Sequence, residues 1–537
     1  MKNTTIFYLV VLLLLTISGY SQKKDEENVI KQHYIDYYDS EQKYKRSEGD
    51  FVLGKETGEW KFWYKDGTLK EISNYKNGRF HGKTTVFYPN AQKQSEGCFY
   101  YNLPDSIYKE WYSNGQQKII GYYHRGVKDS IWHTWYFNGQ KKKEEQCRNG
   151  LCKTLNFWDS TGVQLVTNGK GIEKIFIPDS IYEEFQIDEG LYNGYFLAKY
   201  PDGTLKTTGF FKNHEKDSTW TWFYKNGKPR KIITYQNGKP HGLYKELYPN
   251  GQIKAEGQYL NGKKNGKWNW YFQNGQLDMT GYFIDDRQHG YWKYYYTNGQ
   301  LQYEGKFIEG KEDSTWTYFY KGGELYRKGN YKQGLKDSVW TTWFENGQKL
   351  QEGPYQAGKE HGFWQAWYQN GQLKDKGNYS HGLMDGFWEG WYPNGNKNYE
   401  GTLKQGLKEG KWTFWFEDGK LREKGSYKQG KRDGYWEFYY ELSGKMESKG
   451  RFKDNKPVGE WHYYYPTGQL ERIVHLNEEG RLHGKSQAWF QGGQLMMEAE
   501  YKNGRPDGIM KVYNKHGDLV KHLKYKNGHI EKDYLEK

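Results

Sequence analysis

The stretch from Gly266 to Phe283 reads Gly-Lys-Trp-Asn-Trp-Tyr-Phe-Gln-Asn-Gly-Gln-Leu-Asp-Met-Thr-Gly-Tyr-Phe. Two runs of apolar and aromatic residues flank the dipeptide Asn274-Gly275. This arrangement is typical of a β-hairpin, and we expect a type I′ turn, in which both central residues have positive φ. A polar loop that ends at Gly290 follows the second run. The stretch therefore predicts two antiparallel strands joined by a tight turn.

The same unit recurs along nearly the whole chain. The Gly of the turn dipeptide returns every 24 residues from Gly203 to Gly419, and about 19 copies are found when single-residue insertions and deletions are allowed. The period fails once, between Gly162 and Gly203, which are 41 residues apart where two full repeats would give 48. Tandem hairpins of one length predict an all-β fold, an elongated open antiparallel sheet of stacked 24-residue repeats.

Counting outward from the turn gives the partners across each hairpin. A Trp then faces a strand Gly, and an indole over the bare Gly backbone restores the packing that a missing side chain loses. The resulting structural repeat residues are Trp268, Trp292, Trp316, Trp340, Trp364, Trp388 and Trp412, with Gly281, Gly305, Gly329, Gly353, Gly377, Gly401 and Gly425 opposite them. The same count pairs Gln273 with Gln276, Phe272 with Leu277 and Trp270 with Met279. Alternation along the strands predicts one buried face, formed by Trp268, Trp270, Phe272, Leu277, Met279, Gly281 and Phe283.

The two ends of the chain differ from the repeats. Lys2, an apolar run over 6–15 and the small residues Gly19 and Ser21 predict a secretory signal peptide at 1–21. We therefore expect an exported protein, periplasmic, extracellular or at the cell surface, with a retained signal anchor as the alternative. No later segment approaches the ~20 apolar residues that a membrane helix needs.

The rest of the chain divides by how closely it follows the repeat. We expect an N-terminal cap segment at 22–49 that includes a short helix, and hairpin repeats of 24 residues at 50–172 and 194–528. An irregular shortened repeat is expected at 173–193, and a charged C-terminal tail at 529–537.

Residue types that often carry chemistry fall on the repeat itself. Several His residues come directly before one loop Gly, which marks them as loop residues: His81, His241, His289, His361 and His483. Six copies replace that Gly by Ser after Asp, and we interpret these as turn variants rather than nucleophiles: Asp105-Ser106, Asp129-Ser130, Asp179-Ser180, Asp217-Ser218, Asp313-Ser314 and Asp337-Ser338. The chain has no His-Glu-x-x-His, P-loop or Gly-x-Ser-x-Gly motif. We expect no catalytic residue, no metal and no cofactor.

The three cysteines allow one local bridge. Cys147 and Cys152 flank a single loop, and an oxidising compartment would permit a disulfide between them, with Cys98 left free. The alternative is that all three are reduced, and the sequence leaves this open.

The second face of the predicted sheet carries a candidate binding surface. Trp343, Trp367, Trp391 and Trp415 occupy one register in four successive repeats, and we call them the Trp stripe. Their neighbours on that face are polar: Thr341, Gln365, Glu389 and Thr413. Large rigid rings on a polar face suit contact with a partner. The alternative is that the rings only stack along the ladder of a single-layer sheet.

Charge adds little to this choice. The 80 Lys and Arg exceed the 66 Asp and Glu by 14, but both signs are interleaved through the turns. A solvated edge of the sheet explains this mild bias, and the alternative is attraction to anionic envelope polymers or lipid headgroups. No nucleic-acid partner is expected.

The repeat pattern Gly-x-Trp-x-x-aromatic-aromatic-x-Asn-Gly, followed by Leu, Gly, Tyr and Asn-Gly at set places, resembles the MORN-repeat variant of bacterial YwqK-type antitoxin proteins. The resemblance covers about residues 50–528. It implies an open sheet of hairpins used for protein or membrane contact without catalysis. We therefore expect a non-catalytic scaffold that binds a protein or the cell envelope. Two alternatives stay open, an antitoxin or immunity protein that neutralises a toxin and a cell-wall glycan-binding protein.

Overall fold

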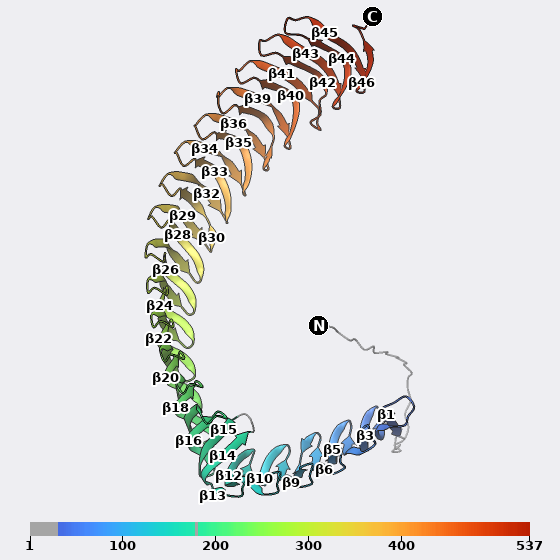
Figure 1. Cartoon of the computed structure of the whole chain (residues 1–537), viewed down its shortest axis with the longest axis vertical. Helices are drawn as coiled ribbons and strands as arrows, with labels where there is room; N and C mark the ends of the chain where they lie inside the picture. Colours follow the sequence, from blue (N-terminus) through green and yellow to red (C-terminus); the bar gives the residue numbers. More distant parts are fainter. Residues whose placement is uncertain (1–30, 178–180, 537) are drawn as a thin grey trace, which may run out of the picture. The chain divides into compact units, whose positions relative to one another are not determined.

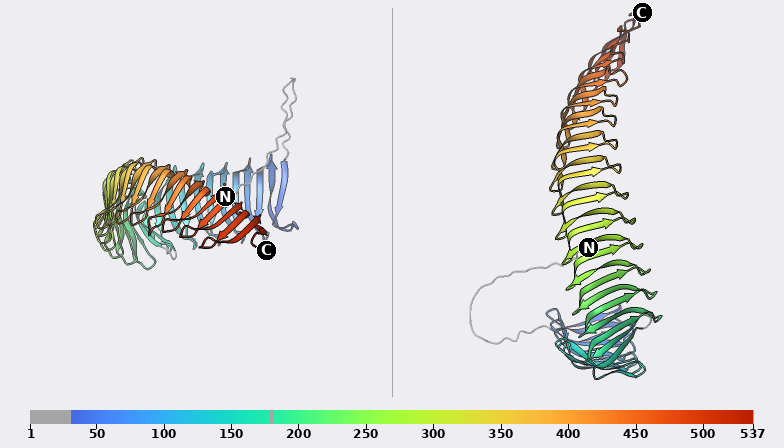
Figure 2. Two further views of the ribbon diagram at one scale, coloured as in Figure 1. Left: turned by 90° about the horizontal axis from the view of Figure 1, so that it is seen from above. Right: turned by 90° about the vertical axis from the view of Figure 1, so that its left-hand side faces the viewer.

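The computed structural model describes residues 31–177 and 181–536. These residues contain 46 β-strands and no helix, so none of them belongs to a helix long and apolar enough to cross a membrane. They fall into two compact units, unit 1 (Met1–Glu215) and unit 2 (Lys216–Lys537). Within each unit successive strands pair antiparallel, and the hairpins stack side by side as rungs of an open sheet (Figures 1 and 2). The all-β repeat fold expected from the 24-residue period is confirmed.

The strands of unit 1 are β1 (Lys31–Tyr37), β2 (Lys45–Val52), β3 (Lys55–Trp63), β4 (Leu69–Lys76), β5 (Arg79–Phe87), β6 (Lys93–Tyr100), β7 (Leu103–Pro104), β8 (Ser106–Trp111), β9 (Gln117–His124), β10 (Val127–Trp135), β11 (Lys141–Arg148), β12 (Leu151–Trp158), β13 (Gln164–Thr167), β14 (Lys170–Ile177), β15 (Ile181–Asp188), β16 (Leu191–Lys199) and β17 (Leu205–Lys212). Those of unit 2 are β18 (Glu215–Phe223), which begins one residue earlier, β19 (Pro229–Gln236), β20 (Lys239–Leu247), β21 (Ile253–Leu260), β22 (Lys263–Tyr271), β23 (Leu277–Ile284), β24 (Arg287–Tyr295), β25 (Leu301–Ile308), β26 (Lys311–Phe319), β27 (Leu325–Lys332), β28 (Leu335–Trp343), β29 (Lys349–Gln356), β30 (Lys359–Glu360), β31 (Gly362–Trp367), β32 (Leu373–Ser380), β33 (Leu383–Trp391), β34 (Lys397–Lys404), β35 (Leu407–Trp415), β36 (Leu421–Lys428), β37 (Lys431–Arg432), β38 (Gly434–Tyr439), β39 (Met446–Lys453), β40 (Lys456–Tyr464), β41 (Leu470–Leu476), β42 (Gly484–Trp489), β43 (Leu495–Lys502), β44 (Arg505–Tyr513), β45 (Leu519–Lys526) and β46 (His529–Asp533).

Two different turns alternate along the chain, and the sequence analysis assigned the type I′ turn to the wrong one. At the Asn274-Gly275 dipeptide only the Gly has positive φ, at 86°. The Gly275 N–H donates to the Phe272 carbonyl (2.9 Å), and the Phe272 N–H donates to the Gln276 carbonyl (2.8 Å). This is a three-residue turn with Gly in the left-handed region, a form that Asn-Gly also suits. The turn with two positive φ values lies in the loop between hairpins, as at Asn261 (52°) and Gly262 (89°) before this hairpin and at Asp285 (49°) and Asp286 (68°) after it.

The three-residue turn changes the expected pairing near it. Tyr271, not Phe272, pairs with Leu277, because the register shifts between Trp270 and Tyr271, and Gln273 lies within the turn. Farther from the turn the partners are those counted from the sequence, with Trp270 opposite Met279 and Trp268 opposite Gly281. The six later Trp–Gly pairs also lie opposite each other.

Each of these indoles, however, covers a different Gly from the one opposite it. A Cβ on Gly281 would overlap the ring of Trp292, from the next repeat, and not that of its partner Trp268. The ring also donates its Nε1–H to the carbonyl ten residues earlier, as from Trp292 to Tyr282 (3.2 Å). Each Trp therefore joins its own hairpin to the preceding one. The contacts in unit 2 are Trp268 on Gly257, Trp292 on Gly281, Trp316 on Gly305, Trp340 on Gly329, Trp364 on Gly353, Trp388 on Gly377, Trp412 on Gly401, Trp436 on Gly425 and Trp461 on Gly450.

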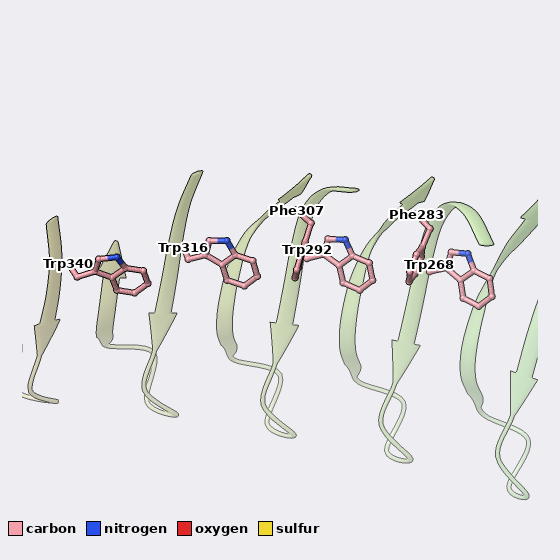
Figure 3. Packing of buried hydrophobic residues seen from close by; sticks show 6 residues of the cluster. All are labelled: Trp268, Phe283, Trp292, Phe307, Trp316 and Trp340. Atoms are coloured by element: carbon pink, nitrogen blue, oxygen red, sulfur yellow. The ribbon is translucent and has the colours of Figure 1, made fainter. Parts of the chain in front are cut away.

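These rings form the core on one face of unit 2, which we call the first face. The seven Trp residues of the structural repeat are 1–7% exposed. Phe283 and Phe307 lie between successive indoles at near right angles, with ring centroids 5.1 Å apart for Phe283 and Trp292 (Figure 3). Trp270 and Met279 pack against the same cluster, whereas Phe272 and Leu277, beside the turn, are not part of it. A single-layer sheet thus builds a continuous core from aromatic rings along its length.

The ends of the described chain are also strands. β1 and β2 form an antiparallel hairpin, so the helix expected within 22–49 is wrong for the part that is described. The ring of Tyr34 packs on Phe51 at 5.4 Å and on Trp60 at 6.1 Å, which extends the aromatic row of the sheet. The charged tail expected at 529–537 begins with β46, which pairs with β45. The signal peptide expected at 1–21 lies outside the described residues.

The shortened repeat makes a corner in unit 1. β13 has only four residues, and the turns around it fold against β12: the Thr154 N–H donates to the Gly190 carbonyl (2.8 Å) and the Gly169 N–H to the Leu155 carbonyl (2.7 Å). Phe157 and Val166 are fully buried there. The departure from the repeat thus begins before residue 173, where the sequence analysis placed it. Ser180 and its two preceding residues lie outside the described residues.

The bridge that the sequence left open is present beside this corner. Cys147 and Cys152 are opposite residues of β11 and β12 and form a disulfide, while Cys98 is free. The Asp-Ser turn variants that are described have Ser with positive φ, as at Ser338 (58°), where the hydroxyl donates to Asp337 (3.0 Å).

Candidate functional site

The Trp stripe lies at the ends of four strands of unit 2. Trp343 ends β28, Trp367 ends β31, Trp391 ends β33 and Trp415 ends β35, and all four are half-buried. Successive members are two strands apart, which corresponds to about 9.6 Å along the sheet. The rings lie in one register on the second face, opposite the buried core, because each is an odd number of residues from the buried Trp of its own strand.

Lysines are inserted between the rings of the stripe. Lys349 pairs with Trp343 across the hairpin, and its Nζ lies 5.6 Å from the ring centroid of Trp367. Lys397 lies 6.0 Å from the ring of Trp391 and 5.6 Å from that of Trp415. Elsewhere in unit 2 this strand position is mostly Leu. The stripe therefore alternates aromatic faces with cations, an arrangement stabilised by cation–π attraction.

Acidic residues on the same face balance these cations. Lys349 lies 2.7 Å from Glu352, and Glu352 also accepts a hydrogen bond from the hydroxyl of Thr341 (2.9 Å). Glu389 is paired with Lys397 (2.9 Å) and with Lys376 (3.1 Å). The hydrogen bond from Lys397 holds the pKa of Glu389 below its ordinary value. The polar side of the stripe is thus a network of charged pairs at neutral pH.

The main chain under the stripe is held by tyrosines of the preceding repeats. The hydroxyls of Tyr320, Tyr368 and Tyr392 each donate to the carbonyl of a stripe Trp, 23 residues later, at 2.9 Å. Such bonds join one hairpin to the next at the same edge as the rings. They fix the positions of the rings relative to one another.

A second apolar row runs beside the stripe, and the sequence analysis missed it. Val339, Phe363 and Phe387 are 53%, 50% and 52% exposed and precede the buried Trp of three successive repeats. Each lies four residues before a stripe Trp on the same strand, so both rows are on the second face. The 24-residue spacing of these three apolar residues is the feature of the sequence that could have revealed the row.

Unit 1 has the same register of Trp residues, which the sequence analysis also missed. Trp63, Trp111, Trp135 and Trp158 end their strands as the stripe residues do, and Trp111 and Trp158 have Lys93 and Lys141 at 5.6 and 5.4 Å from their rings. We call these four the unit 1 Trp set. The arrangement is therefore a property of the repeat and not of the stripe alone.

Residues 31–177 and 181–536 hold no group of three or more His, Cys, Asp or Glu side chains that could bind a metal ion. The periodic His residues lie at the loop edge, where for example the Nδ1 of His241 accepts the Asn261 N–H at 3.4 Å. The charged side chains of the second face are engaged with each other.

Comparison with known proteins identifies the repeat. Ten segments match the family model described as MORN repeat variant: residues 56–77, 216–237, 240–261, 264–285, 288–309, 336–357, 360–381, 408–429, 457–478 and 482–503. No curated protein matches the chain.

Among solved structures, the chain is similar to those titled "Crystal Structure of TcdB2-TccC3-Cdc42" and "Structure of Photorhabdus luminescens Tc holotoxin pore, Mutation TccC3-D651A". Identity is 10% in both, with TM-scores of 0.13 and 0.12. Each match covers 94% of this chain and 34% or 35% of the other, so the chain spans about a third of the length of these proteins.

Proposed function

The chain is built from repeats of the MORN repeat variant family, and from this premise we propose that it is an exported, non-catalytic scaffold that binds a protein or a cell-envelope component along its sheet. The contact surface is the Trp stripe, Trp343, Trp367, Trp391 and Trp415, together with the apolar row beside it. No cofactor and no nucleic acid take part.

The observation that carries the proposal is that the Trp stripe and the apolar row lie side by side on the second face. The stripe is half-buried, and the row of Val339, Phe363 and Phe387 is about half exposed. The sheet already has a core on its first face, so these rings are not needed there. Rigid rings give contact area at a low cost in conformational entropy, and interfaces are enriched in them. The charged pairs between the rows suit the polar part of an interface.

Two features support export. The signal-like segment at 1–21 would direct the chain out of the cytoplasm. The disulfide between Cys147 and Cys152 suits an oxidising compartment, since cytosolic thiols are normally kept reduced. The mature protein is then periplasmic, extracellular or at the cell surface, and its partner is in the same place.

The test uses the purified full-length mature chain as bait for an envelope extract at low and high salt. Replacing all four stripe Trp residues by Thr should abolish retention of the partner while the circular dichroism of the strands stays the same. The matched control replaces Trp63, Trp111, Trp135 and Trp158 by Thr, which removes the same rings from the unit 1 Trp set and should leave retention unchanged. Full retention by the stripe variant would refute the site.

The identity of the retained molecule separates the alternatives. A single protein held in near-stoichiometric amounts at high salt supports a dedicated partner. If that protein is a toxin, the chain is an antitoxin or immunity protein. Retention of envelope polysaccharide alone, lost at high salt, would instead support glycan attachment at the cell surface.

A further inference from the structure

A groove of about 660 Å³ lies at the corner of unit 1. It opens between the turn at Asn149 and Gly150, which joins β11 to β12, and the residues Leu191, Asn213 and His214 at the ends of β16 and β17. In a regular stack of 24-residue hairpins, the turn of another hairpin would lie between the Asn149-Gly150 turn and the ends of β16 and β17. Here the repeat is seven residues short, and β12 bonds directly to Gly190, so the two turns face each other across a groove. Its volume is within the range of small-ligand sites, about 300–1,000 Å³.

The lining of the groove is cationic. Arg148 and Lys153 both line it, and neither forms an ion pair with any residue of the described chain. No carboxylate is among the lining residues. The side-chain amides of Gln146, Asn149 and Asn213 lie beside the two cations and can both donate and accept hydrogen bonds. A group with negative charge and further polar atoms is therefore favoured here.

The same groove also offers apolar contact. Leu151 is 79% exposed, and Leu191 is half-buried on the opposite side. Cys152, which is in the disulfide with Cys147, also lines the groove. A ligand that places an anionic group at the cations can thus bury an apolar group against the leucines.

The wall of the groove is held in place before any ligand binds. The disulfide joins β11 to β12, and the ring of His214 accepts the Tyr192 N–H at Nδ1 (3.2 Å) and donates to the main chain of Cys152. These bonds fix the two sides of the groove relative to each other, which lowers the entropy lost on binding.

A comparable groove in unit 2 shows what is special about this one. It also lies between successive loop turns and measures about 430 Å³. Its cations Lys263 and Arg287, however, share the lining with the carboxylates of Asp285 and Glu309. That groove is neutralised by its own residues, whereas the groove of unit 1 is not.

We propose that the groove at the corner of unit 1 binds the free C-terminal end of a peptide whose last residue is apolar. The terminal carboxylate lies between Arg148 and Lys153, the last peptide groups hydrogen-bond to the amides, and the apolar side chain packs on Leu151 and Leu191. The assignment is independent of the proposed function of the Trp stripe, which lies in unit 2.

The test exposes the immobilised full-length chain to a pool of N-acetylated hexapeptides, randomised over the last three residues, with either a free or an amidated C-terminus. We expect enrichment of free-acid peptides that end in an apolar residue, and affinities for the enriched peptides at least about tenfold higher than for their amides. Hexanoate serves as a small acid with an apolar tail but no peptide groups. Equal binding of the amides, or hexanoate binding as tightly as the peptides, would overturn the assignment.

Variants locate the site. Arg148→Gln with Lys153→Gln should reduce the affinity at least about tenfold, and both side chains are exposed, so the fold is retained. The control pair, Lys263→Gln with Arg287→Gln, removes the same charge from the groove of unit 2 and should change nothing. An equal loss of peptide affinity in both double variants would indicate general charge attraction and would refute a specific site. Failure of the unmodified chain to enrich any free-acid peptide would also refute the proposal.

Discussion

Gly329 of β27 lies beneath the indole of Trp340 of β28, and this contact allows a quantitative prediction. A Cβ at residue 329 would overlap the ring, which is only 2% exposed and has no free space beside it. Overpacking of this kind costs about 1–3 kcal/mol. The displaced ring also loses the bond from its N–H to the Asn330 carbonyl, now 2.9 Å long, which adds about 1 kcal/mol. We therefore expect Gly329→Ala to lower the local free energy of unfolding by about 2–4 kcal/mol.

The assay is hydrogen exchange of the full chain, read by mass spectrometry. In a repeat protein each hairpin is stabilised mainly by its neighbours, so the damage should be local. Amides of β27 and β28 should exchange faster, and those of distant repeats should not change. Gly322→Ala is the matched control, because Gly322 has no positive φ and its Cβ meets only the flexible carboxylate of Glu324.

A double variant tests the cause. The chain itself contains the pair Ser73 and Thr84 at the positions equivalent to Gly329 and Trp340, and the two lie opposite each other. Adding Trp340→Thr to Gly329→Ala should therefore cost less than the sum of the single changes, by about 1–3 kcal/mol. Additive costs, or a cost of Gly329→Ala no larger than that of Gly322→Ala, would refute the reasoning that an indole covers this Gly.

Three further outcomes are expected. Phe344→Tyr supplies the hydroxyl that other repeats use and should donate to the Trp367 carbonyl, stabilising that hairpin by about 0.5–1.5 kcal/mol; unchanged exchange at β31 would contradict the role of the tyrosine bonds. Cys152→Ser opens a disulfide between residues five apart, and because the loop is short, the loss in unfolding free energy should be below the ~3 kcal/mol of a 15-residue loop; a larger loss in denaturant titrations would show that the bridge holds more than its own hairpin. Burial lowers the pKa of His214 from its ordinary value of 6.5, so the folded state favours the neutral ring, and its contribution to stability is present above pH 6.5 and is lost as the pH falls through the folded pKa. Thermal unfolding measured from pH 7.5 to 5 should show this loss as a fall in stability with falling pH, and His214→Gln should make the stability depend less steeply on pH. An equal pH dependence in both proteins would contradict this role of His214.

Local rules explain why the hairpins could be predicted from the sequence. Turn dipeptides and period-two alternation act within about ten residues, and they place Trp268 opposite Gly281 whatever the rest of the chain does. The Trp stripe could be placed on the second face for the same reason. The type of turn at Asn274 could not be chosen, because Asn-Gly is compatible with both the two-residue and the three-residue turn.

The contacts between repeats needed the structure. Which Gly an indole covers depends on a shift of register between neighbouring hairpins, where Trp292 reaches back over Gly281. The insertion of Lys397 between two stripe rings depends on the reach of a flexible side chain across strands. Neither contact can be predicted from the residue spacing within one repeat.

The sequence by itself determined the repeat length, the hairpin, the two faces and the residues on each, because these follow from the alternation of side chains and the backbone preferences of Gly and Asn. The tertiary structure decided how one hairpin holds the next, that the N-terminal segment continues the sheet, and that the shortened repeat opens a cationic groove beside Cys152. These features come from packing between different hairpins. Their free energy depends on distances and burial that no local pattern specifies.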